Sequence, residues 1–356
     1  MGGIQKNHTD SEIDFVVTWV DGNDSAWQKQ KALYSRLEQE ENTQKNANTG
    51  TQRYRDWELM RYWFRGVEQF AQWVHKIYFV TWGHVPEWLN MEHPRLVVVK
   101  HEDFMPAEYL PTFNSSAILV NIHRIRGLSN KFVLFNDDMF ILRKVTEKDF
   151  FCNGLPKEEA LLDTLVKQDG RDSFAHCLMN NAGIINQHFN KKQVLKSYWH
   201  KFLTPVYGMQ LLRTILLLPF RNFSGFRDAH IPSAYLKEAY TEVWEEEREL
   251  LDRTSRHRFR NVEDVNEWLI KDWQLCKGRF VPRRHSWGQH FELGVDDAEL
   301  LKAIRQQRYT TICINDSDPG IDYENTKKLL IQAFEEIFPK SSAFERGVYT
   351  DVRCDS

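Results

Sequence analysis

The sequence predicts an α/β protein with a parallel, Rossmann-like sheet core and a large helical insertion. Two observations support this prediction. Short apolar, β-branched runs alternate with helical segments up to about residue 150, and the chain is mostly helical after about residue 155. Strands that alternate with helices are typical of a parallel sheet. Ligands normally bind at the carboxyl ends of such strands, so the polar residues that follow each apolar run are the first candidates for a functional site.

Each expected element of the core follows from its residue pattern. Residues 13–20 (IDFVVTWV) form an apolar run that leads into the polar turn DGND, which predicts a buried strand. Residues 56–70 have apolar side chains at helical spacing. The other expected strands are 76–81, 95–100 and 131–136, and the other expected helices are 25–48 and 115–126.

The second half of the chain has a different pattern. Its expected helices are 193–198, 209–218, 234–252 and 262–275, followed by a strand at 310–315 and a helix at 323–337. We therefore expect an α/β core that binds nucleotide-sugar and metal, made of residues 12–150 and 305–346. We expect residues 151–304 to form a mostly helical region that completes the active site.

The longest apolar run is 211–218 (LLRTILLL), which is far shorter than the ~20 residues that cross a bilayer. We favour a buried core helix here, because an apolar run of this length is more often buried than membrane-bound. The alternative is an interfacial segment that lies on a membrane surface.

Composition excludes some classes of protein. The 47 Lys and Arg and 50 Asp and Glu give a net charge of −3, which argues against a dedicated nucleic-acid binder. The five scattered cysteines show neither zinc-ligand spacing nor a disulfide framework. The first residues lack the apolar core of a signal peptide. Because a reducing compartment suits this cysteine usage, we expect a cytoplasmic protein, either free or peripheral at the inner face of the membrane.

The first candidate site is Asn136-Asp137-Asp138, which ends an apolar strand. Adjacent carboxylates at such a junction suit a hard divalent cation, because Mg²⁺ prefers one or two carboxylates together with substrate phosphates. A helix N-cap or an Asx turn explains the same residues equally well.

A second candidate is Trp19-Val20-Asp21-Gly22, at the end of the first strand. Glycine permits close backbone approach to a ligand, and aspartate accepts hydrogen bonds from a ribose or a base. The alternative is a tight turn without a ligand.

The remaining candidates are single residues or short groups. Arg53, Arg55, Arg61 and Arg65 suit phosphate oxygens, although a solvated helix face is the commoner explanation. His230 offers a proton acceptor near neutral pH, although a lone histidine before a Pro-containing turn is more often structural. Arg260 belongs to a run of four arginines, one of which would be enough to hold a diphosphate, although pairing with the acidic helix before the run is the commoner explanation. Asn114 and Ser115 are either the N-cap of a helix or an oxygen-rich contact to substrate, and Asn315 ends the late strand.

The order and wording of these motifs resemble the Stealth family. The resemblance lies in six stretches of sequence. The family's first two conserved regions resemble IDFVVTWVDGND, RYRDWELMRYWFRGVEQF and LPTFNSSAILVNIHRIRGLSNKFVLFNDDMF. The third resembles GFRDAHIPSAYLKEAYTEVWEEE and TSRHRFRNVEDVNEWL, and the fourth resembles TTICINDSDPGIDYENTKKLL. The resemblance covers most of residues 12–346. Members include bacterial capsular polysaccharide phosphotransferases and the enzyme that tags lysosomal glycoproteins with N-acetylglucosamine phosphate.

The resemblance implies a glycosyltransferase-A-like version of the α/β core and a sugar-phosphate transferase activity. Such enzymes move hexose 1-phosphate from a UDP-sugar onto an acceptor hydroxyl, which forms a phosphodiester and releases UMP. Asp137 and Asp138 are expected to hold Mg²⁺ (or Mn²⁺), Arg260 to hold the transferred phosphate, and His230 to accept the acceptor's proton, so that Asp137, His230 and Arg260 are the expected catalytic residues. The residues expected to bind substrate are Trp19, Asp21, Gly22, Arg55, Asp56, Arg61, Asn114, Ser115, Asn136 and Asn315.

The expected partners are a UDP-hexose donor and an oligosaccharide or lipid-linked saccharide acceptor, with no nucleic acid. Contact with a membrane surface and homo-oligomerisation both stay open. The main alternative is a metal-dependent glycosyltransferase, which would use the same donor but release UDP. A catalytically silent sugar-binding protein is a third interpretation, and would bind a UDP-sugar without turnover.

Overall fold

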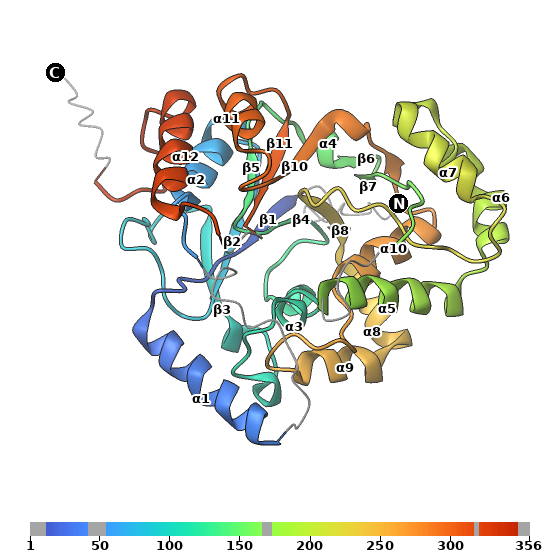
Figure 1. Cartoon of the computed structure of the whole chain (residues 1–356), viewed down its shortest axis with the longest axis horizontal. Helices are drawn as coiled ribbons and strands as arrows, with labels where there is room; N and C mark the ends of the chain where they lie inside the picture. The colour runs from blue at the N-terminus through green and yellow to red at the C-terminus, as the bar shows by residue number, and fades with distance from the viewer. Residues whose placement is uncertain (1–11, 42–54, 166–172, 317–319, 348–356) are drawn as a thin grey trace, which may run out of the picture.

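The computed structural model describes residues 12–41, 55–165, 173–316 and 320–347, and its central feature is a five-stranded sheet (Figure 1). The strand order is β3-β2-β1-β4-β8. The first four strands are parallel and β8 is antiparallel to β4. The order 3-2-1-4 is that of the first four strands of a Rossmann sheet, so the predicted α/β, parallel-sheet fold class is confirmed. The strands are β1 Ile13–Thr18, β2 Ile77–Thr81, β3 Leu96–Lys100, β4 Lys131–Phe135 and β8 Ser233–Leu236.

Burial on both faces explains why the central strands read as nearly continuous apolar runs. Every residue of β2 is buried, as are the first five of β1 and the last four of β4. Helix α2 (Met60–Phe70) covers the sheet with Trp63 and Phe64. Its Gly66 passes so close to β5 that an added Cβ would lie 2.9 Å from the carbonyl oxygen of Ile141. This position therefore needs glycine.

Two smaller sheets complete the fold. One has the order β10-β11-β5 (Gly288–Glu292, Thr311–Asn315 and Met139–Ile141), and the other has the order β6-β7-β9 (Phe151–Cys152, Leu155–Glu158 and Val281–Pro282). Residues 136–138 connect β4 directly to β5. This short connection, which carries the two predicted metal ligands, therefore lies where the central sheet meets the second sheet.

Helices surround the sheets. Besides α2 they are α1 Ser25–Glu41, α3 Ser115–Leu119, α4 Glu147–Phe150, α5 Ser173–His188, α6 Lys191–Phe202, α7 Leu211–Leu217, α8 Lys237–Glu246, α9 Arg248–Arg256, α10 Trp268–Cys276, α11 Asp297–Arg305 and α12 Tyr323–Ile337. Short 3₁₀ turns lie at His101–Asp103, Ala107–Tyr109, Ile122–Arg124, Pro205–Gln210 (η6) and His285–Trp287.

Several expected boundaries were wrong. The continuous helix expected at 234–252 is strand β8 followed by two helices, because its first apolar residues pair with β4 inside the core. The expected helix 56–70 begins only at Met60, and the helix expected at 115–126 is α3 followed by a 3₁₀ turn. Residues 42–48 of the first expected helix lie outside the described residues, as does Arg53.

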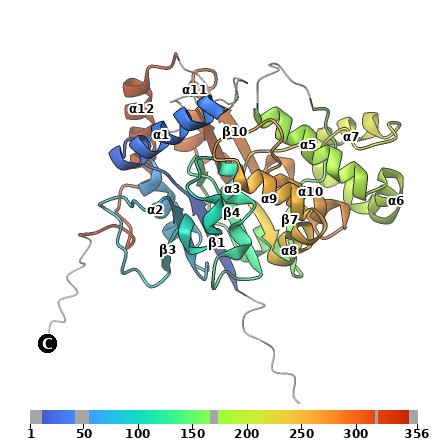
Figure 2. The same ribbon diagram turned by 90° about the horizontal axis from the view of Figure 1, so that it is seen from below.

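The expectation of a buried helix at 211–218 was also wrong. Helix α7 lies at the edge of the molecule beside α6 (Figures 1 and 2), with Leu212 and Leu216 exposed to solvent. An apolar run predicts an apolar helix, but it does not reveal which face of that helix packs against the core. In the part of the chain that the structure describes, no helix is long and apolar enough to span a bilayer.

Candidate active site

Four carboxylates gather at the carboxyl ends of β1 and β4. Asp21 follows β1, and Asp137 and Asp138 follow β4. Asp56 lies just before α2. The charge of Asp56 reaches Asp137 and the charge of Asp21 reaches Asp56, so the structure brings the four together. We call Asp21, Asp56, Asp137 and Asp138 the acidic cluster.

Two carboxyls of the acidic cluster, Asp137 and Asp56, are costly to ionise. The surrounding protein, and then the charges of Asp138 and Asp56, raise the pKa of Asp137 to about 8, although solvent still reaches its surface. Desolvation and the charges of Asp21 and Glu58 also raise the pKa of Asp56. Atom Oδ1 of Asp138 is buried without a hydrogen-bond partner in the described residues. Crowded carboxylates with an unpartnered oxygen fit a hard cation such as Mg²⁺ or Mn²⁺.

Arg55 and Asp56 are held in place by residues at the start of α12 and the end of β11. The Arg55 guanidinium lies 3.6 Å from Asp316 and over the ring of Tyr323. The Tyr323 hydroxyl donates a hydrogen bond to the backbone carbonyl of Asp56. Because Asp316 directly follows Asn315, the end of β11 lies beside Arg55, as the substrate-binding hypothesis requires.

The backbones of Asn136 and Asn315 fix the two strand ends. The Asn136 carbonyl accepts the amide hydrogen of Met139 at 3.2 Å, which closes the β4–β5 turn. The Asn315 carbonyl accepts the amide hydrogen of Leu293 at 3.0 Å. The turn at Asn136 therefore closes through the backbone carbonyl, whereas an Asx turn would close through the side chain.

The turn after β1 is built around a histidine that sequence reasoning missed. The Trp19 ring is only 8 % exposed, stacks on Phe79 and meets the edge of His84. Nε2 of His84 accepts the backbone N–H of Asp21 at 2.7 Å, and burial lowers the His84 pKa. The Gly22 carbonyl accepts a side-chain hydrogen bond at 2.7 Å. The geometry is that of a well-fixed turn, with Trp19 packed in the core beneath it.

His230 occupies a constrained position. Its φ of 45° is rare for a residue with a side chain, and its backbone N–H donates to the Asp228 carboxylate at 2.8 Å. Its ring stacks on His290 with centroids 5.4 Å apart, and Phe174 stacks against it at 6.3 Å. Asp228 also pairs with the buried Lys271 at 3.3 Å. The loop thus fixes the imidazole's position from several sides.

A second group of metal-type donors adjoins the acidic cluster. The ligand atoms of His230, His290 and Cys313 all lie within 4.8 Å of one another, and the charge of Asp138 reaches the Cys313 thiol. Burial, and then the Asp138 charge, raise the pKa of that thiol. Imidazole and thiolate suit zinc-like metals, whereas Mg²⁺ and Mn²⁺ select carboxylates, so the acidic cluster is the better fit for the expected cation.

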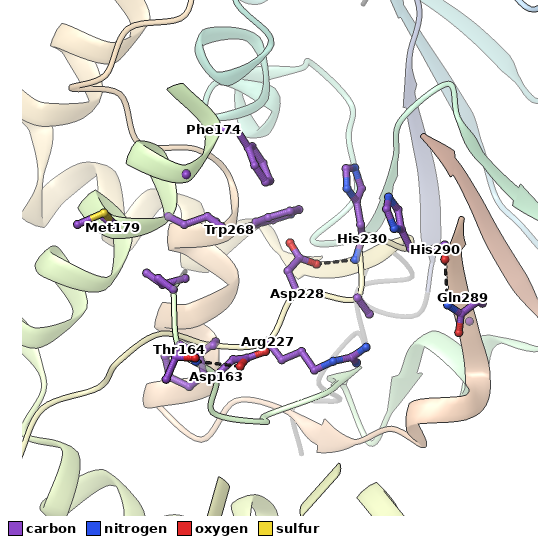
Figure 3. Close-up of a pocket in the computed structure, with 16 residues that line it drawn as sticks. Asp163, Thr164, Phe174, Met179, Arg227, Asp228, His230, Trp268, Gln289 and His290 are labelled. Carbon is purple, nitrogen blue, oxygen red and sulfur yellow. Dashed lines mark hydrogen bonds between the residues drawn. The ribbon is translucent and has the colours of Figure 1, made fainter. Parts of the chain in front are cut away.

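A pocket of about 380 Å³ opens beside His230. Figure 3 shows His230 and His290 at one end of it and Met179 at the other, with Phe174 and Trp268 between them. The charge of Asp138 reaches His290, so the histidine end of the pocket lies next to the acidic cluster. Aromatic rings beside a few polar groups suit a saccharide.

Arg260 lies against the start of α3 and is not among the residues that line the pocket. Its Nη2 donates to the Ser115 hydroxyl at 2.7 Å. Asn114 is fully buried and caps α3 by accepting the amide hydrogen of Ser116, which confirms the N-cap interpretation. The Asn114 amide also donates to Asp264 at 2.8 Å. Asn114 therefore positions the start of α3 and, because it is fully buried, leaves no surface for a direct substrate contact.

The other predicted arginines point elsewhere. Arg61 packs over the Trp88 ring at 5.3 Å. Arg65 is buried and bonds both carboxylate oxygens of Glu345 at 2.8 and 3.0 Å, so a solvated helix face was the wrong interpretation for Arg65. Neither has a recorded contact with the acidic cluster in the described chain. An apolar helical pattern does not reveal which charged residues turn inward.

The buried carboxyl of Asp272 predicts that the free energy of unfolding depends on pH. Burial, together with the charges of Asp228 and Glu158, raises the pKa of Asp272 from 3.8 to about 8, and Lys271 opposes the shift. The native state therefore binds a proton that the unfolded state releases, so this group's stabilisation is lost as the pH rises from 3.8 towards 8. We expect Asp272→Asn to raise the melting temperature relative to wild type at about pH 8.5 more than at about pH 5.

Thermal unfolding at the two pH values measures this effect. Glu238→Gln, at an exposed carboxylate, is the control. An equal effect of Asp272→Asn at both pH values would contradict the shifted pKa.

Comparisons with known proteins agree with the sequence motifs. Models of Stealth protein conserved regions 1, 2 and 4 match residues 11–37, 53–158 and 302–350. The capsular polysaccharide phosphotransferase WcwK of Streptococcus pneumoniae is 43 % identical over 94 % of this chain and 98 % of its own. The exopolysaccharide phosphotransferase cps2G of Lactiplantibacillus plantarum is 39 % identical over 94 % of this chain and 96 % of its own. Among solved structures, the galactosyltransferase LgtC aligns over 90 % of this chain and 95 % of its own, with 9 % identity and a TM-score of 0.38.

Proposed function

Because the chain belongs to the Stealth family and is a transferase enzyme, we propose that it transfers hexose 1-phosphate from a UDP-sugar to a saccharide hydroxyl and releases UMP. The proposed setting is the synthesis of capsular or other cell-surface polysaccharide, as in the names of its relatives. The observation that carries the proposal is the position of His230, between the acidic cluster and a pocket of saccharide size.

The donor diphosphate belongs on the acidic-cluster side. Asp137 and Asp138 would hold the divalent cation, which when bound supplies positive charge to the diphosphate oxygens. Arg55 lies at the edge of this region, where its guanidinium can meet the same oxygens. The turn at Asp21 and Gly22, fixed by His84, closes the β1 end of the site, where the uridine is expected to lie.

The acceptor belongs in the pocket. An acceptor hydroxyl at its histidine end would lie against the His230 imidazole. His230 takes the hydroxyl proton, the acceptor oxygen forms a bond to the sugar-bearing phosphorus, and the bond from that phosphorus to the oxygen of UMP breaks. Asp228 holds the His230 backbone, and the packed rings of His290 and Phe174 restrict the imidazole. The imidazole is thus oriented before the acceptor arrives.

Arg260 is proposed to hold the transferred phosphate. We expect Arg260→Lys to lower kcat by roughly 10²-fold, because a compact ammonium cannot present two parallel N–H groups to phosphate oxygens. Steady-state kinetics with UDP-sugar and acceptor measures the loss. Arg253→Lys, at an exposed arginine, is the matched control. Wild-type kcat in Arg260→Lys would remove Arg260 from the proposed mechanism.

The released nucleotide separates the proposal from a metal-dependent glycosyltransferase. Attack at phosphorus releases UMP, whereas attack at the anomeric carbon releases UDP. Chromatography of the nucleotides formed from a panel of UDP-sugars, with acceptor and Mg²⁺ or Mn²⁺, tests the assignment. We expect acceptor-dependent UMP; acceptor-dependent UDP would overturn it, and tight donor binding without any turnover would favour a silent binding protein.

A further inference from the structure

One edge of the molecule carries an unusual number of exposed apolar side chains. Of the thirteen large apolar residues that are most exposed in the described chain, seven lie between residues 199 and 220. Two of them, Met209 and Leu216, are 78 % and 75 % exposed. We call this group the α6–α7 patch; its members are Trp199, Val206, Met209, Leu212, Ile215, Leu216 and Phe220.

The fold holds the α6–α7 patch outward. On its inner side, α7 buries Thr214 and Leu217, and the Thr214 hydroxyl accepts the backbone N–H of Leu162 at 3.0 Å. The helix therefore turns a threonine to the core while Leu212 and Leu216 face solvent. Figures 1 and 2 show α6 and α7 side by side at this edge. Exposed apolar side chains gathered on two neighbouring helices in this way indicate an interaction site.

The charge around the patch identifies the kind of partner. The sequence from 173 to 227 contains seven Lys and Arg and no Asp or Glu, in a chain whose net charge is −3. Some of these cations are engaged internally, since Arg213 pairs with Asp163 and Lys191 donates to backbone carbonyls. Lys192, Lys196 and Arg221 are exposed beside the apolar residues. Exposed apolar side chains flanked by the exposed cations Lys192, Lys196 and Arg221 suit an anionic lipid surface.

We propose that the α6–α7 patch docks the enzyme on the anionic face of a lipid bilayer. The apolar side chains enter the boundary between headgroups and acyl chains, and the lysines and arginines meet the lipid phosphates. Docking itself does not depend on the proposed reaction.

Docking would also place the pocket close to the membrane. Asp163 lines the pocket and pairs with Arg213 of α7. The backbone N–H of Asp163 donates a hydrogen bond to the carbonyl of Gly225 at 3.1 Å. The pocket wall and α7 are thus joined through a few residues. A saccharide carried on a lipid would meet the pocket at this edge, a consequence that does rest on the proposed function.

Vesicle flotation of the full chain tests the docking. We expect the protein to float with vesicles that contain phosphatidylglycerol, to bind phosphatidylcholine vesicles much less, and to lose binding as salt rises. Leu216→Asp should weaken partitioning about tenfold or more, because a charged side chain replaces a buried leucine at the interface. Val295→Asp is the matched control, since Val295 is also 75 % exposed but lies outside the patch. Exchanging Lys192 and Lys196 for glutamate should remove the preference for anionic lipid.

Two further measurements keep the result interpretable. Circular dichroism and turnover of a short water-soluble acceptor should be the same in wild type and Leu216→Asp, which separates docking from folding and from the reaction. Equal flotation of wild type and Leu216→Asp, or no flotation of wild type, would overturn the proposal. So would sedimentation showing that wild type is a dimer and Leu216→Asp a monomer, because the patch would then bind a second copy of the chain.

Discussion

We expect the His230→Ala enzyme to lose kcat by roughly 10²–10⁴-fold, because general-base catalysis by a positioned side chain is usually worth that much. The affinity for UDP-sugar should stay close to that of wild type, since His230 lines the pocket and the donor is proposed to bind on the acidic-cluster side. Calorimetric titration with UDP-sugar and steady-state turnover together measure the two quantities.

His200→Ala is the matched control for this variant. His200 is an exposed histidine of α6, away from the pocket residues, so its loss should leave turnover of a soluble acceptor unchanged. A His230→Ala enzyme that keeps its kcat would remove the imidazole from the mechanism. Equal losses of donor affinity and kcat would make His230 a structural residue.

The second large effect is expected for Asp137→Asn. We expect a loss of about 10³-fold or more in kcat, because charge stabilisation by a bound divalent cation is worth several kcal/mol and an amide is a much weaker ligand. Excess Mg²⁺ or Mn²⁺ should not restore full activity. Manganese titration and kinetics at increasing metal concentration measure the effect.

The fold of the Asp137→Asn variant can be checked independently. Desolvation, and then the charges of Asp138 and Asp56, raise the pKa of Asp137 to about 8, so above that pH the metal-free variant should melt at least as high as wild type. Glu238→Gln is the control for removing a carboxylate at a distant, exposed position. Full wild-type activity in saturating chelator would defeat the metal role of the acidic cluster.

The central sheet was readable from the sequence because buried parallel strands leave a simple signal. The apolar runs of β1, β2, β3 and β4 end within two residues of their expected limits, and α12 matches its expected range. Strand β8 was not readable, because its four residues run into a helix and only its pairing with β4 makes them extended. Local propensity was overridden by tertiary context there.

The site shows the same division between local and distant information. Asp137 and Asp138 are adjacent in sequence and follow a strand, so their role as a candidate metal site could be predicted. His290 and Cys313 carry no motif, and they reach His230 only because β10 and β11 pair beside the central sheet. The outward face of α7 also depends on which side of the helix meets the core.

Phosphorus NMR of the saccharide product tests the central claim most directly. The account predicts that a sugar-linked phosphate of the UDP-sugar ends in the product, as a phosphodiester resonance whose formation needs the acceptor and matches the amount of UMP released. A glycosylated product with no phosphorus resonance, formed together with UDP, would contradict the account.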